Sequence, residues 1–375
     1  MAITVIKTAR IYYEISEIYS LLHIIFLTMT FIGLKNHVTI IPSLLNGAGR
    51  DAWFSVIFSI FLMIPWLVLP FITLKKLKDE SLRMYLLNNH PKLGKVLIFI
   101  IAFYLLLMAV ITMHETLQWV STTFLLQTPP LLLFFFFTVV CLLLATSSIL
   151  TITMVNVVVL FGVVVLGFFI AFVNIQVKDY ALLQPFFEHG FTPIFTSMVY
   201  PASGFIELYL LVFIQQHFKT KLKFWHLLIM LFLLFGLTLG PLVGAIAEFG
   251  PTEAAKQRYP AFEEWRIATI GSFINHIDFF SIYQWLTGAF VRIGFILFIA
   301  VELLGLTGQK KKVWEYIFPL FVFCSLPLYL LDDSIFSKWK GQYFLISTTL
   351  FFFVLSIILF ILVNRKTKRK LEYND

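Results

Sequence analysis

The stretch SMVYPASGFIELYLL, residues 197–211, decides how the rest of the chain is interpreted. Apolar residues flank a Tyr-Pro-Ala-Ser-Gly core, and Glu207 follows within one helical turn. Proline and glycine are the least favourable residues for a helix interior, and a carboxylate is costly in lipid. A hydrophobic segment that is broken in its middle, beside an acid, predicts a polar interruption inside a membrane-crossing helix. A simple kink of the kind that membrane helices tolerate is the alternative.

The composition of the whole chain is that of a membrane protein with several spans. Of its 375 residues, 60% are hydrophobic and only 13% are charged, and the mean hydropathy is +0.92. Soluble domains average roughly 45–50% apolar and about 25% charged residues. The two cysteines, Cys141 and Cys324, lie inside separate apolar stretches. They are predicted to be small buried hydrophobic residues rather than a disulfide or a metal site.

Ten segments are predicted to cross the membrane as helices, because a crossing needs about 20 mostly apolar residues whose backbone groups bond to one another. They are 18–45, 52–74, 95–119, 129–147, 150–174, 193–217, 224–247, 277–303, 313–331 and 342–363. The predicted fold class is therefore an all-α integral membrane protein. It forms a single transmembrane domain, 1–375, with a short basic tail at 364–375.

Positive charges alternate between the two sides of this arrangement. The side that holds both termini carries 19 Lys and Arg residues, and the other side carries seven: Arg50, Lys178, Lys256, Arg258, Arg266, Lys338 and Lys340. The positive-inside rule then places both termini in the cytoplasm. The net charge of +8 is explained by basic loops that face anionic lipid headgroups, so membrane lipid is an expected partner and nucleic acid is not.

The first span is interrupted in a way that matches the sixth. Gly33, Lys35 and Asn36 lie well inside the first apolar segment. Two interrupted segments at corresponding positions of two halves point to the inverted repeat of transporter-type folds. The predicted repeats are about 18–174 and about 193–363, each with five helices, and helices 1 and 6 are discontinuous. The symmetry is one of position, since the halves share no residue-level identity.

The two interruptions together define the predicted ligand site. At a helix break, unpaired N–H groups favour anions and unpaired carbonyls favour cations. This combination suits a small zwitterion, such as an amino acid, near the middle of the membrane. The residues expected to bind it are Gly33, Lys35, Asn36, Tyr200, Ala202, Ser203, Gly204, Glu207 and, from the third span, Glu115.

The charged residues of the spans leave several interpretations open. Glu207 can pair with Lys35, accept a hydrogen bond from a ligand ammonium group, or line a water path. Glu115 is expected near the outer end of its span, so exposure at the membrane interface is the alternative to a functional role. Arg292 and Glu302 in the eighth span are interpreted as structural pairing charges.

The segment 251–276, PTEAAKQRYPAFEEWRIATIGSFINH, is too polar to cross the membrane. It is predicted to form an amphipathic helix along the outer surface. Such a helix is either a structural element or a lid or docking face. Its proposed face consists of Phe262, Arg266, Ile270, Phe273 and Ile274.

The chain contains no HExxH, GxSxG, Walker A or CxxC motif. It is therefore not expected to be an enzyme, and no cofactor or metal site is predicted.

Four stretches resemble the B subunits of bacterial spore germinant receptors. NGAGRDAWFSVIFS (46–59) looks like the Gly-x-Asp-Ala-Trp start of the family's second span, and HETLQWVSTTFLLQTP (114–129) is similar to the end of its third. GFIELYLL (204–211) matches the Gly-x-x-Glu pattern after the sixth-span break. YPAFEEWRIATIGSFINHID (259–278) resembles the family's outer segment and is the most specific of the four.

The resemblance implies a fold and a function. The family belongs to the amino acid–polyamine–organocation transporter superfamily, which implies ten helices in two inverted repeats. It also implies a subunit that senses a small germinant in the inner membrane of the spore, together with an A subunit and a lipoprotein C subunit. The alternative is an amino acid or amine permease. Proton-coupled relatives commonly place a Lys in the fifth helix, whereas 150–174 contains none, and this favours a sensor.

Overall fold

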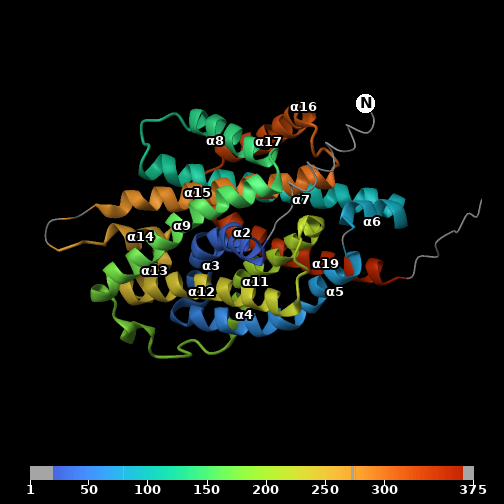
Figure 1. The fold of residues 1–375 in the computed structure, drawn as a ribbon. Helices are drawn as coiled ribbons and strands as arrows, with labels where there is room; N and C mark the ends of the chain where they lie inside the picture. The colour runs from blue at the N-terminus through green and yellow to red at the C-terminus, as the bar shows by residue number, and fades with distance from the viewer. Residues whose placement is uncertain (1–19, 79, 272–273, 275, 366–375) are drawn as a thin grey trace, which may run out of the picture.

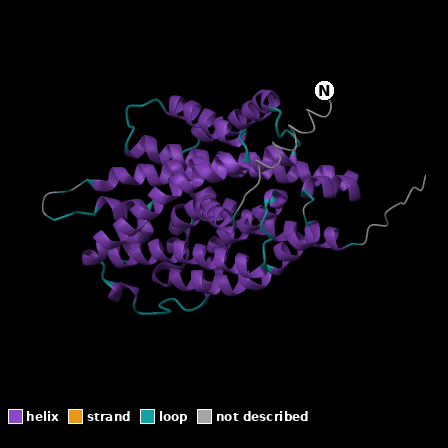
Figure 2. Ribbon diagram, viewed as in Figure 1, coloured by secondary structure: helices purple, strands orange, loops and turns teal. Residues whose placement is uncertain are grey.

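The computed structural model describes residues 20–365, except 79, 272–273 and 275. Most of them are helical, and Figure 2 shows helices that are joined by loops of different lengths. Within these residues the only β-type contact is a single bridge between Ile270 and Ile274. The N-terminal segment 1–19 and the end of the basic tail, 366–375, lie outside the described residues.

Nine helical segments of the described chain are long and apolar enough to cross a membrane. They are Leu21–Thr39 (α2, η1), Ile41–Leu77 (α3 to α5), Pro91–Thr123 (α7), Ile149–Val177 (α9, η3), Thr192–Phe213 (α10, α11, η5), Phe224–Phe249 (α12), Ile277–Leu303 (η7, α15), Lys310–Leu330 (α16, η8, α17, η9) and Asp333–Asn364 (α18, η10, α19). The predicted all-α membrane architecture is confirmed at this level.

The remaining expected span, 129–147, corresponds to α8 (Pro130–Ala145), which has 16 residues. At about 1.5 Å per residue it reaches about 24 Å, which is less than the roughly 30 Å of a hydrocarbon core. The helix is short because Pro129 and Pro130 fix its start and Thr146 ends it. Outside the spans, α6 (Leu82–Asn89) lies between the second and third of them.

Helix α2 (Leu21–Leu34) is the centre of the bundle. It packs against α9 (Ile149–Val173), α12 and α15 (Phe280–Leu303), and in Figure 1 it lies between α15 above and α12 below. Ile24, Leu27 and Phe31 are fully buried on it. These three positions recur with the helical period and form one buried face. The polar residues Thr28 and Thr30 between them are also buried, so neighbouring helices surround α2.

The first interruption is a widened turn that is followed by a bend. After α2, residues Lys35–Thr39 form the π-helical turn η1, and α3 (Ile41–Ala48) begins with a proline in its first turn. A π turn holds an extra residue while its backbone remains hydrogen-bonded. The chain then bends at Ile40, where the backbone bonds from Ile40 N–H to the Lys35 carbonyl and from Leu44 N–H to the Ile40 carbonyl cross the junction. Pro42 has no N–H group to continue the ladder. The first span is therefore interrupted, but its interruption lies at Ile40 rather than at Gly33.

The sixth span turns at Met198 and then changes its helix type. Its α-helical ladder breaks at Met198, three residues before Pro201, between α10 (Thr192–Ser197) and α11 (Val199–Phe205). Proline has no N–H group and crowds the preceding turn, which accounts for this break. The chain then tightens into the 3₁₀ helix η5 (Ile206–Phe213). The expected unwinding at Gly204 is replaced by a change of helix type.

The predicted outer amphipathic helix is wrong as a single element. The segment forms α13 (Pro251–Lys256) and α14 (Pro260–Arg266), followed by the turn that carries the Ile270–Ile274 bridge. Prolines begin both short helices, and Gly271 has a φ of +61° that ends any helix. Of the expected face, Phe262 is buried, Ile270 and Ile274 are exposed, and Phe273 lies outside the described residues.

Candidate functional site

Three charged side chains from three spans meet in the centre of the protein. Lys35 Nζ lies 2.9 Å from Glu207 Oε1, and Arg292 binds both oxygens of the same carboxylate at 2.7 and 3.0 Å. The exposed fractions are 3% for Lys35, 0% for Glu207 and 3% for Arg292. The predicted pairing of Lys35 with Glu207 is confirmed, and the planar guanidinium of Arg292 adds the fork geometry that suits a carboxylate.

The two interruptions supply backbone acceptors for these cations. Lys35 Nζ donates to the carbonyl of Ser203 at 2.8 Å, and Arg292 Nη1 donates to the carbonyl of Phe31. A buried cation is tolerable only when its donors are satisfied. The central carboxylate and these carbonyls therefore hold helices α2, α11 and α15 together around one polar core.

Gly204 serves a different purpose from the one expected. A Cβ placed on Gly204 would overlap Asn36, with its Cγ only 2.6 Å away. The Asn36 amide occupies the space that was predicted for a ligand, and its Nδ2 donates to Thr238 Oγ1 at 3.0 Å. Glycine is required here because a side chain, rather than a ligand, approaches the backbone.

A second buried ion pair lies beside the first. Lys340, on the π turn Lys340–Phe344 (η10), pairs with Glu115 of α7. Thr39 Oγ1 donates to the other oxygen of Glu115 at 2.9 Å. Glu115 is 4% exposed and Lys340 6%, so both side chains are covered by protein. The expectation that Lys340 is a loop charge is wrong, because the last helical segment begins at Asp333 and carries Lys340 inward.

A small cavity of about 10 Å³ lies between the two ion clusters. It is lined by Leu34, Lys35, Thr39, Ile111, Thr112, Glu115, Thr116, Trp285, Arg292 and Phe344. This volume is about the minimum for one water molecule. In this conformation the ion pairs of the protein fill the centre, and an amino acid needs a rearrangement to enter.

The cavity carries a positive formal charge and an unsatisfied hydroxyl. Three cations, Lys35, Arg292 and Lys340, face two carboxylates, so one positive charge is in excess. Thr116 Oγ1 is buried and has no hydrogen-bond partner among the described residues. Both properties suit a small ligand with a carboxylate group.

The structure brings together only part of the predicted site. Ser203, Ala202, Asn36 and Gly204 are buried near the central carboxylate, whereas Tyr200 is half-buried and packs near Gly47. Gly33 faces Leu237 instead of the ion cluster. Sequence reasoning did not assign Arg292 and Lys340 to the site. An intramembrane charge is itself a signal of function, but the signal does not name the partner.

A separate polar cluster lies beneath the outer segment. Asn174 Nδ2 donates to Glu248 Oε2 at 3.0 Å and to the carbonyl of Glu264 at 2.8 Å, and Lys178 lies 3.3 Å from Glu248. Burial and then the neighbouring Glu248 carboxylate raise the pKa of Glu264 well above its usual value, against a smaller opposite effect of Lys178. The backbone carbonyl of Glu264 thus anchors α14 to Asn174, and the side chain of Glu264 is buried beside Glu248.

The fold and the site together define a polytopic helical membrane protein whose polar centre is built from its interrupted spans. Residues 12–327 match the family described as spore germination protein, and the chain belongs to this family. It is 38% identical over 343 residues to spore germination protein XB of Bacillus anthracis, which covers 90% of this chain and 96% of that protein. The predicted resemblance is confirmed.

A second relative is more distant. The putative spore germination protein YfkT of Bacillus subtilis (strain 168) is 24% identical over 288 residues, which covers 75% of this chain and 76% of that protein. The similarity to both relatives extends over most of the chain. The family match, residues 12–327, includes the predicted first, third, sixth and eighth spans, which carry Lys35, Glu115, Glu207 and Arg292; Lys340 lies beyond it.

Proposed function

We propose that this protein is the germinant-sensing transmembrane subunit of a spore germination receptor. It binds a small nutrient such as an amino acid beside the interruptions of helices 1 and 6. The observation that carries the proposal is the excess positive charge around the central cavity, next to the unsatisfied hydroxyl of Thr116. A ligand carboxylate would balance the charge, and a ligand donor or acceptor would satisfy the hydroxyl.

The closed state of the site supports sensing by a change in population. The ion pairs of Lys35 and Lys340 occupy the centre, so a ligand competes with contacts that hold the helices together. A ligand shifts such an equilibrium only by binding one state more tightly than the other. Exchange of an internal ion pair for a ligand carboxylate provides that difference in affinity.

The finer architecture belongs to the same proposal. We infer ten membrane helices in two inverted five-helix repeats, with α8 as a short fourth helix and both termini on the cytoplasmic or core side of the spore inner membrane. The whole chain, 1–375, forms one transmembrane domain. The proposed partners are an A-type subunit and a lipoprotein C-type subunit, to which the occupied state is signalled.

The test replaces the unsatisfied hydroxyl without changing its shape. Thr116→Val should weaken saturable binding of labelled L-amino acids to the purified protein by up to about tenfold, since one hydrogen bond contributes roughly 0.5–1.5 kcal/mol. Spores with this variant as their only copy should need correspondingly more nutrient to germinate. Thr138→Val is the matched control, because Thr138 is also buried and unpartnered but does not line the cavity. Equal affinities of the two variants would contradict the proposed site.

Uptake measurements separate a sensor from a permease. The protein in liposomes should bind a labelled amino acid without sustained accumulation of label inside. Continuous flux that Thr116→Val abolishes would instead identify the chain as an amino acid or amine permease.

A further inference from the structure

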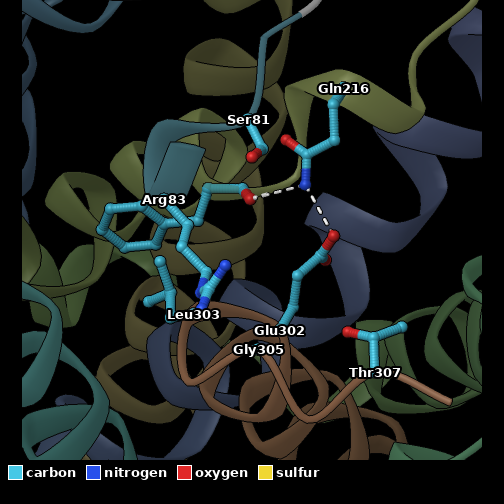
Figure 3. A pocket seen from close by; sticks show the side chains of 8 residues that line it. Ser81, Arg83, Gln216, Glu302, Leu303, Gly305 and Thr307 are labelled. Carbon is cyan, nitrogen blue, oxygen red and sulfur yellow. Dashed lines mark hydrogen bonds between the residues drawn. The ribbon is translucent and has the colours of Figure 1, made fainter. Parts of the chain in front are cut away.

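A second, larger cavity lies near the C-terminal ends of the sixth and eighth spans. Its volume is about 210 Å³, and it is lined by Ser81, Arg83, Phe213, Gln216, Glu302, Leu303, Gly305 and Thr307. Figure 3 shows that the side chains of Arg83, Gln216 and Glu302 surround it. The loops around it belong to the side with the larger number of Lys and Arg residues, so this cavity is distinct from the central site in place and in lining.

Arg83 contributes an unsatisfied cation to this cavity. Its guanidinium has no hydrogen-bond or ion-pair partner within the part of the chain that the structure describes. It rests against the backbone of Gly305, where an added Cβ would lie 2.6 Å from Nη2. Gly305 also has a φ of +75°, so glycine is favoured twice at this position. The turn after α15 thus leaves room for the guanidinium at the cavity wall.

Glu302 contributes an acceptor on the opposite wall. Its Oε1 lies 2.7 Å from Gln216 Nε2 and 2.7 Å from His217 Nε2. Its Oε2 is buried without a partner, and so is Oε1 of Gln216. Arg83 and Glu302 both line the cavity, yet no ion pair within 4 Å joins them among the described residues. The cavity is therefore lined by an unpaired cation and by a carboxylate with one unmatched oxygen.

We propose that this basic-side cavity binds a small zwitterion. Its anionic group would contact the guanidinium of Arg83, and its ammonium group would contact the carboxylate of Glu302. Charge-assisted hydrogen bonds of this kind are among the strongest that proteins make. The volume is below the roughly 300–1,000 Å³ of pockets for drug-sized ligands, which suits a small ligand. Free α-amino acids and phosphoethanolamine headgroups share the required chemistry.

The position of the cavity gives its occupant influence over the centre. Glu302 and Arg292 lie on the same helix, α15, ten residues or about 15 Å apart. Gln216 follows the helical segment that carries Glu207. A ligand that contacts Glu302, which is bonded to Gln216, therefore stabilises the end of the helix pair whose middle is joined by Glu207 and Arg292. The proposal does not depend on which ligand the central cavity binds.

Protection of an introduced thiol tests this inference directly. Thr307→Cys places a thiol on the cavity wall in a Cys324→Ser background, where the remaining Cys141 is buried. The rate of N-ethylmaleimide labelling is measured on the lipid-stripped, detergent-purified full chain. Millimolar L-alanine or phosphoethanolamine should slow labelling severalfold, whereas sodium acetate or ethylammonium chloride should have little effect. Lys312→Cys, an exposed position on the same side, should label at an unchanged rate.

Two variants and two lipid environments complete the test. Arg83→Gln and Glu302→Gln should each remove the protection, while Thr116→Val at the central cavity should leave it intact. If the headgroup is the source, nanodiscs of phosphatidylethanolamine should protect the thiol without added ligand and nanodiscs of phosphatidylglycerol should not. Protection by free L-alanine in both kinds of nanodisc identifies the soluble source. Absence of protection by any zwitterion, or protection that survives both Gln variants, would overturn the proposal.

Discussion

The side chain of Asn36 lies directly against the backbone of Gly204, in the space that any larger residue at this position would fill. The contact joins the widened turn of the first span to the tightened turn of the sixth. The Asn36 amide packs where Gly204 has no Cβ, and this contact fixes the two interruptions relative to each other. It lies next to the ion pair of Lys35 and Glu207.

Gly204→Ala should destabilise the protein by about 1–3 kcal/mol, because the new methyl group overpacks the contact with Asn36. Thermal unfolding of the purified protein measures the effect. Gly236→Ala is the control, since nothing lies within 4 Å of a Cβ at that position. Adding Asn36→Ala to Gly204→Ala should restore part of the loss. An equal effect of the two glycine substitutions would show that the Asn36 contact is unimportant.

Glu207→Gln should be more harmful than Lys35→Met. Loss of the carboxylate leaves two buried cations without a counterion, and an unpaired buried charge costs about 3–5 kcal/mol. Loss of Lys35 leaves Glu207 still bound to Arg292. A double-mutant cycle on unfolding free energies should give a coupling of at least about 0.5 kcal/mol. Strict additivity would contradict the buried pair.

Lys340→Met should lower stability and the germination response together, because it leaves Glu115 with only the hydroxyl of Thr39. Lys338→Met is the matched control, since Lys338 is exposed on the same helical segment. The double variant Lys340→Met/Glu115→Gln should be milder than Lys340→Met alone. If Lys338→Met and Lys340→Met behave alike, the inward position of Lys340 is wrong.

Glu264 should make stability depend on pH. Burial and then the Glu248 carboxylate raise the pKa of Glu264 in the folded protein above its ordinary value of 4.5. The folded state therefore binds this proton more tightly than the unfolded chain. The free energy of unfolding should fall as the pH rises from about the ordinary value to the raised pKa, and should then level off.

Glu264→Gln should remove this component of the pH dependence and raise the unfolding temperature at neutral pH. Glu263→Gln should keep it, because Glu263 lies nearer the surface and pairs with Arg266 at 3.0 Å. A pH profile that is the same in wild type and Glu264→Gln would refute the assignment.

The pairing of Lys35 with Glu207 was predictable because both residues lie beside matching interruptions in the sequence. The contribution of Arg292 was not, since α15 is apolar on most of its surface and its sequence does not fix which face meets the sixth span. Lys340 was misplaced because hydropathy alone begins the last span at residue 342, two residues after it. The π turn that carries Lys340 inward leaves no mark in the apolar pattern.

The expected unwinding failed for a related reason. Glycine, proline and polar residues mark where a helix departs from regular geometry, but they do not say whether it opens, widens or tightens. Here the first span widens at Lys35–Thr39 and then bends at Ile40, and the sixth tightens at Ile206–Phe213. The space that opening would have provided is taken up by Asn36 and the three central charges.

Both buried lysines of the centre are the first residues of π turns, Lys35–Thr39 and Lys340–Phe344. Each such turn accommodates one residue more than the α-helical turn it replaces. Removing one residue from either turn would rotate the preceding segment by about 100° relative to the following one. The rotation would swing the lysine away from its carboxylate without the loss of any charge. The two buried ion pairs therefore depend on the number of residues in these π turns as well as on the residue types. Deletion of one residue from either turn should break its ion pair, as removal of the lysine charge would.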